Sequence, residues 1–172
     1  MKTSSSSGLP TTSARSLSAL RIAVGCLFLI FAEYKVFGMQ FTRGGGFQYW
    51  INRFLQGGAY PFMISVLRNF VLPHATVIAF FVGCGELAIG IAMVSGIFVR
   101  PASVCGMVYM LTLLFSSNYP GANAPLWKYV GASLDHSVLA LCFAAFALTN
   151  PEELWSIYSL RRRSLSPQRE VH

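Results

Sequence analysis

The chain has 172 residues, of which 54 % are hydrophobic and only 11 % are charged. Soluble domains carry roughly 25 % charged residues, so this chain has too few charges to cover a globular surface in water. Its net charge of +7 lies mainly near the two ends and is not interleaved with aromatic residues, which excludes a nucleic-acid-binding surface. The composition therefore predicts an integral membrane protein with one domain.

The N-terminal half of the chain predicts a polar tail, one membrane span and a long connection. Residues 1–16 are rich in Ser and Thr, which is typical of a disordered tail. The first span covers about residues 17–37, with an apolar core at 22–32. The connection, residues 38–73, mixes aromatic residues with scattered arginines, which favours one or two short amphipathic helices at the membrane interface.

Three more spans are predicted in the C-terminal half, within a membrane domain that covers residues 17–149. The second span, residues 74–98, follows Pro73, which is a favourable residue at a helix start. The third span covers 101–117, and the fourth covers about 127–149 before Asn150 and Pro151 end it. We therefore expect an all-α, four-helix membrane bundle with a basic C-terminal tail at 150–172.

The distribution of lysine and arginine predicts the orientation of this bundle. If both termini lie on one side, that side holds eight basic residues and the other side holds five. The rule that cytoplasmic loops are the more basic then places both termini in the cytoplasm of a cell with a bacterial-type inner membrane. The firmest part of this prediction is the run of three arginines just after the last span, residues 161–163.

The most informative residue within the predicted spans is Glu86, near the middle of the second span. Helical periodicity places it on one face with the small residues Ala79, Gly83 and Gly90. Small residues allow close helix approach, so Glu86 is predicted to point into the bundle. It could meet a partner, a proton path or a ligand there, or it could be a structural glutamate that is paired or protonated.

Three ionisable residues lie in the first span. Arg21 shares a face with Gly25, and its side chain either extends to the lipid headgroups or forms an ion pair with Glu86 or a ligand. Lys35, near the outer end, is expected to extend toward the headgroups. Glu33 has too short a side chain to do so easily, which favours a polar environment inside the protein.

Asp135 and His136 are adjacent and lie about two turns into the fourth span. Together with Glu33 and Glu86 they could line a polar pocket that opens to the outer face. A carboxylate and an imidazole are suited to proton exchange with a reduced quinone, so Glu86, Asp135 and His136 are the candidate catalytic residues. The alternative is a network of hydrogen bonds between helices that only fixes their packing.

The sequence carries no recognisable motif for a resident cofactor. The four cysteines lie in four different apolar runs, without the C-x-x-C spacing of redox or zinc sites, and no metal site is predicted. A glycine run, residues 44–46, lacks the Lys-Ser/Thr ending of a phosphate-binding loop. An electron-transfer role for this chain therefore requires a redox centre from a partner subunit.

The second span carries Gly-Glu near its middle and a glycine four residues later, and it leads into the third span through a Gly-x-x-x-Arg turn from Gly96 to Arg100. The first span carries Arg21, Gly25 and a closing Lys35-x-x-Gly38. In these residues the chain resembles the DoxX/DoxD family of small four-span membrane proteins. Asp135 and His136 have no counterpart that the resemblance supplies.

The resemblance implies a four-helix membrane fold, with Arg21, Glu86 and Arg100 as residues of the family pattern. The DoxD type is the small subunit of a thiosulfate:quinone oxidoreductase, and other relatives associate with redox enzymes or help to mature respiratory proteins. The expected function is thus a subunit of a quinone-linked oxidoreductase or electron-transfer complex, with quinone as the cofactor it could bind. The alternative is a non-catalytic accessory or assembly subunit of a respiratory or photosynthetic complex.

Overall fold

The structure of the protein is a computed structural model that describes residues 11–149, and all regular elements within that range are helices. Helix α1 covers Thr11–Val36, α2 covers Gly46–Gly57 and α3 covers Pro61–Val66, which continues as a π-helical turn, η1, over Leu67–Val71. The C-terminal half contains α4 (Ala75–Ser95), α5 (Val99–Ser116), α6 (Leu126–Gly131) and α7 (Leu134–Leu148). The predicted tails fall largely outside the described residues.

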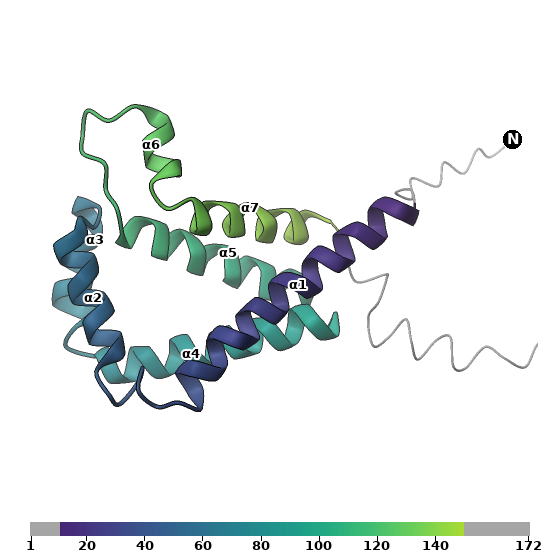
Figure 1. Ribbon diagram of the computed structural model, residues 1–172, viewed down its shortest axis with the longest axis horizontal. Coiled ribbons are helices and arrows are strands. Elements are labelled where there is room, and N and C mark those ends of the chain that lie inside the picture. The colour runs from purple at the N-terminus through teal and green to yellow at the C-terminus, as the bar shows by residue number, and fades with distance from the viewer. Residues whose placement is uncertain (1–10, 150–172) are drawn as a thin grey trace, which may run out of the picture.

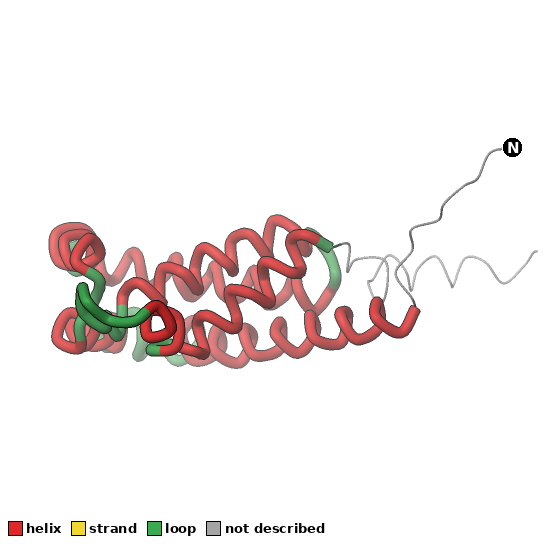
Figure 2. The backbone as a smooth tube through the Cα atoms, turned by 90° about the horizontal axis from the view of Figure 1, so that it is seen from above, coloured by secondary structure: helices red, strands yellow, loops and turns green. Residues whose placement is uncertain are grey.

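The long helices form two antiparallel pairs. Helix α1 packs along α4, and α5 packs along α7, while the α4–α5 turn joins the two pairs (Figure 1). Short helices α2 and α3 cross one end of these pairs at a steep angle, and Figure 2 shows them almost end-on while the long helices run across the view. The predicted short helices in the connection are therefore present, between the ends of α1 and α4.

Within residues 11–149, three helices are long and apolar enough to cross a membrane: Ala14–Val36, Ala75–Ser95 and Val99–Ser116. Their outward faces carry large apolar side chains, as expected for surfaces in lipid: Ile30, Phe31 and Phe81 are each more than half exposed. The first of these helices begins at Thr11, six residues before the predicted start of the span. The residues from Ala14 to Leu17 do not interrupt the helix, because none of them is glycine or proline.

The predicted fourth span is not one continuous helix. It is divided into α6 and α7 by a break at Ala132 and Ser133, where the Ser133 backbone leaves the helical region. The Ser133 hydroxyl lies 3.2 Å from that of Ser117 and accepts a hydrogen bond from Asn118, while the Ser137 hydroxyl donates to the Val130 carbonyl. These side-chain hydrogen bonds satisfy backbone polar groups that lack partners where the helix is broken. The apolar helix after the break, α7, has 15 residues.

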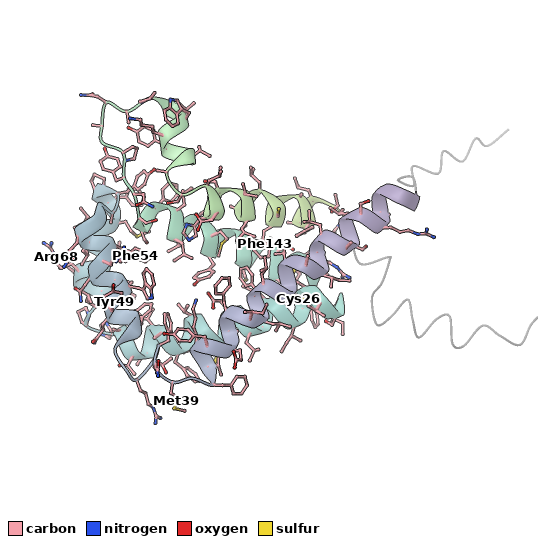
Figure 3. The ribbon with its side chains drawn as sticks, in the orientation of Figure 1. Cys26, Met39, Tyr49, Phe54, Arg68 and Phe143 are labelled. Carbon is pink, nitrogen blue, oxygen red and sulfur yellow. The ribbon has the colours of Figure 1, made fainter. Side chains whose placement is uncertain are left out.

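Close contact between the helices of each pair depends on glycine. A Cβ atom on Gly25 of α1 would lie 2.9 Å from Met93 of α4, and one on Gly90 of α4 would lie 2.7 Å from Leu29 of α1. In the second pair, Gly106 of α5 leaves room for the ring of Phe143, which points from α7 into the interior (Figure 3). The small face predicted for the second span is thus the face that packs.

The buried apolar residues form two separate clusters. One lies among the long helices and includes Phe28, Met93 and Phe143; the other lies beneath α2 and α3 and includes Phe41, Ile51 and Ala79. Helix α4 contributes to both clusters. Glu86 lies between its residues in the second cluster, Ala75 and Ala79, and its residues in the first cluster, Ile89 and Met93.

An aromatic junction ties the short helices to the α5–α6 loop. The Tyr60 amide donates to the Phe115 carbonyl, the Tyr60 hydroxyl donates to the Tyr129 carbonyl, and the Tyr60 ring packs against the ring of Tyr119. Burial of Tyr60, with the nearby tyrosines, raises the pKa of its phenol above the usual value. This junction holds α2 and α3 in place across the end of the bundle.

Candidate functional site

Glu86 is buried at the centre of the protein and is held by residues from two other helices. Its side chain is 6 % exposed, and its Oε1 atom lies 2.5 Å from Nζ of Lys35 on α1. The hydroxyl of Tyr109 on α5 donates to the same oxygen at 2.5 Å, and Lys35 Nζ lies 3.5 Å from that hydroxyl. These three side chains, which we call the polar triad, join α1, α4 and α5.

The local sequence explains why these side chains meet. Lys35 shares the buried face of α1 with Phe28 and Ala32, which are 4 % and 0 % exposed. Gly83, one turn before Glu86 on α4, brings the two helices close, because a Cβ there would lie 3.4 Å from Lys35 Cβ. The Lys35 stem is therefore directed along α4 to Glu86, and the ammonium group does not extend outward to the headgroups as we had expected.

The two carboxylate oxygens of Glu86 are in different environments. Oε1 takes both partners of the triad, whereas Oε2 is buried and receives no hydrogen bond from the residues that the structure describes. A buried oxygen without a partner is costly, so such an atom marks a position where a proton or a ligand group can be accommodated. The positive charge of Lys35 compensates the carboxylate and lowers the cost of burying it.

Asp135 and His136 lie elsewhere in the protein. The Asp135 side chain is 73 % exposed and that of His136 is 23 % exposed, with Oδ1 and Nδ1 3.3 Å apart. Both residues lie in the first turn of α7, level with the end of α5, because Ser133 contacts Ser117. Tyr109 of the triad lies eight residues before Ser117, which is about 12 Å along a helix.

The structure therefore does not bring together the four residues of the predicted pocket. Glu33 is on the exposed side of α1, Asp135 is exposed on α7, and only Glu86 of the three carboxylates is buried. The catalytic roles of Asp135 and His136 stay predictions. No group of three or more His, Cys, Asp or Glu side chains that could hold a metal ion occurs among residues 11–149.

The remaining residues of the family pattern have two different environments. Arg21 is completely buried in α1, on the same face as Phe28 and one turn before Gly25, whose Cβ position faces Met93 near the end of α4. Arg100 is exposed in the first turn of α5, next to the α4–α5 turn where Phe98 adopts a left-handed conformation with a φ of 54°. The expectation that the Arg21 side chain extends to the headgroups is wrong, because this side chain is completely buried, and the partners that the structure gives Glu86 are Lys35 and Tyr109.

The triad contains two residues that the sequence reasoning did not select as partners of Glu86. Lys35 was expected to extend toward the headgroups, and no role was predicted for Tyr109. The signal for Lys35 was its spacing from Phe28 and Ala32 on one helix face. No comparable signal marks Tyr109, because an aromatic residue in an apolar helix is common.

Comparison with known protein families matches the chain to DoxX. The family model covers residues 16–118, which extend from within α1 to just past the end of α5 and include all three residues of the triad. No curated protein and no solved structure matches the chain. The matched range ends before α6, so it does not include Asp135 and His136.

Proposed function

The chain belongs to the DoxX family, and from this premise we propose that it is a membrane subunit of a quinone-linked oxidoreductase or a related electron-transfer complex. In the proposed topology α1, α4 and α5 cross the bilayer and α7 supplies the core of a fourth crossing. Both termini face the cytoplasm, and α2 and α3 lie at the outer interface. Another subunit of the complex supplies the redox centre, because the sequence carries no recognisable motif for one.

The observation that carries this proposal is the state of Glu86. An ionisable side chain at bilayer depth is costly and is usually retained for a function such as proton transfer. Here one carboxylate oxygen is fixed by Lys35 and Tyr109, and the other is buried without a hydrogen bond from the described residues. This arrangement supports a carboxylate that is held in one orientation with a free position for a proton.

The same feature fits a quinone. A quinone headgroup changes between hydrogen-bond acceptor and donor as it is reduced, and it supplies two-electron chemistry when it is bound. Glu86 Oε2 would hold the proton that is exchanged with it, while Lys35 and Tyr109 orient the carboxylate. In this proposal the Asp135–His136 pair would act separately from Glu86, near the outer end of α7.

Replacement of Glu86 by Gln tests the proposal. The change keeps the shape of the side chain but removes its ability to take up a proton. General acid–base catalysis contributes about 10²–10⁴-fold to rates, so quinone-dependent turnover in native membranes is expected to fall by at least about tenfold. The matched control is Glu33→Gln, which alters an exposed carboxylate on α1 and leaves turnover unchanged.

The amount of assembled complex decides between this proposal and an accessory role. An accessory role is favoured by the triad as a link between three helices, since it would then serve only to fix their packing. Mild-detergent extraction followed by identification of the co-purifying polypeptides and quinone measures assembly. Unchanged turnover per assembled complex in Glu86→Gln would reject the proton-handling role and leave the accessory one.

A further inference from the structure

A small pocket opens at the end of the bundle where α1 meets α2. It has a volume of about 130 Å³ and is lined mainly by the α1–α2 loop and the start of α4. Polar side chains surround it: Thr42, Arg43, Gln48 and Thr76. A water molecule takes up about 30 Å³ in the liquid, so a polar pocket of this size has room for several waters.

Phe41 lines this pocket and also contacts the polar triad. Phe41 is 6 % exposed and lines the pocket, and Lys35 Nζ lies 5.0 Å from the centre of its ring. Its ring packs edge-on against that of Phe47, with the ring centres 5.4 Å apart. The Phe41 ring thus contacts both the pocket and the ammonium group that is paired with Glu86.

Helix α4 provides a second connection between the pocket and Glu86. Ala75 lines the pocket, and Ala79, Gly83 and Glu86 follow it on the same buried face of the helix. Ala75, Ala79 and Gly83 have side chains of one carbon or none. The Lys35 stem lies along this face beside Gly83. The buried face of α4 that lines the pocket at Ala75 therefore also carries Glu86, about 16 Å farther along the helix.

We propose that this pocket is the water-filled entrance through which protons reach the Lys35–Glu86 pair, with Phe41 as the barrier at its base. The proposal rests on the proton-handling role given to Glu86 above and adds the direction of access, from the end of the bundle that α2 and α3 cover. Lys35 is a positioning residue on this route, because its ammonium group lies between the Phe41 ring and the carboxylate.

Acetylation of Lys35 allows a direct test, because its rate, compared between variants, reports how readily a water-soluble reagent reaches the Lys35 amine. A membrane-impermeant amine-acetylating reagent is applied to sealed vesicles containing the full chain, on the side of α2 and α3. Acetylation is followed by mass spectrometry, with exposed Lys128 of α6 as the internal standard. Wild-type Lys35 is expected to react at least tenfold more slowly than Lys128.

Two variants move this rate in opposite directions. Phe41→Ala removes the barrier and is expected to raise the rate at Lys35 at least fivefold relative to Lys128. Thr42→Trp fills the pocket and is expected to lower it. Phe146→Ala is the matched control, because it truncates a fully buried ring of the other apolar cluster without touching the pocket. If Phe41→Ala does not fold, the smaller change Phe41→Leu replaces it.

The outcomes separate this inference from the proposed function. A Lys35 rate that is the same in wild type, Phe41→Ala and Thr42→Trp overturns the entrance, whatever the turnover of Glu86→Gln. An equal rise in Phe146→Ala also overturns it, because the effect is then general loosening of the fold. Opposite shifts in the two pocket variants support the entrance even if Glu86→Gln retains quinone-dependent turnover.

Discussion

The polar triad and the Asp135–His136 pair contain similar chemical groups in similarly apolar helices, yet their environments differ. In the triad, three helices contribute one residue each, and Glu86 is 6 % exposed on its side chain. In the second pair both residues come from one turn of α7, and the Asp135 side chain is 73 % exposed. Burial between helices, rather than the presence of ionisable groups in an apolar segment, distinguishes the two.

The comparison has an energetic consequence. Burial of the Glu86 charge costs free energy, which the contacts with Lys35 and Tyr109 offset. Removal of one partner should therefore lower the free energy of unfolding. The Asp135 side chain is 73 % exposed, so its contact with the partly buried His136 is worth no more than about 0–1 kcal/mol. Variants of the two sites should therefore differ strongly in stability.

The largest effect is expected for Lys35→Met. The substitution keeps the unbranched stem but leaves the Glu86 carboxylate buried without its counter-ion, which costs about 3–5 kcal/mol of unfolding free energy. Unfolding in mild detergent with increasing dodecyl sulfate measures the change. The double variant Lys35→Met/Glu86→Leu should recover most of the loss, because an apolar pair replaces the ionic one. A single variant as stable as wild type would contradict the burial argument.

A smaller effect is expected for Gly90→Ala, which separates helix packing from ion pairing. The added Cβ would lie 2.7 Å from Leu29 Cδ2 and 3.1 Å from the Leu29 backbone nitrogen, so α1 must move away from α4. Overpacking of this kind costs about 1–3 kcal/mol in the same unfolding measurement. Gly85→Ala, on the open side of the same helix, is the control and should be neutral or stabilising.

The smallest effect is expected for Asp135→Asn. The side chain is mostly exposed, so the unfolding free energy should change by no more than about 0.5 kcal/mol. The measurement is the unfolding transition used for Lys35→Met, under identical detergent conditions. A loss as large as that of Lys35→Met would show that the Asp135–His136 pair is also buried in the native protein, and the contrast between the two sites would disappear.

The buried face of α4 could be predicted from the sequence because it depends on a local rule. Helical periodicity places Ala79, Gly83, Glu86 and Gly90 on one side, and all four are buried. Periodicity fails for the fourth span, because the break at Ala132 and Ser133 depends on contacts with Ser117 and Asn118, which lie just after α5.

The sequence predicts only part of the candidate site. The depth of Glu86 follows from the length of an apolar helix, whereas its partners lie 51 and 23 positions away in the chain. Which ionisable groups meet depends on how α1 and α5 are rotated against α4. The glycines at the α1–α4 contact set part of that rotation, but the sequence does not state which side chain each glycine accommodates.

The sequence by itself determined the apolar composition, the existence of the long helices and the faces on which small residues and Glu86 lie, because these are local properties of the chain. Only the tertiary structure decided that Lys35 turns inward, that Tyr109 joins it, and that Asp135 and His136 remain apart from Glu86. The physical reason is that helix pairing selects a few contacts among many of similar local character. Burial then makes those few contacts energetically important.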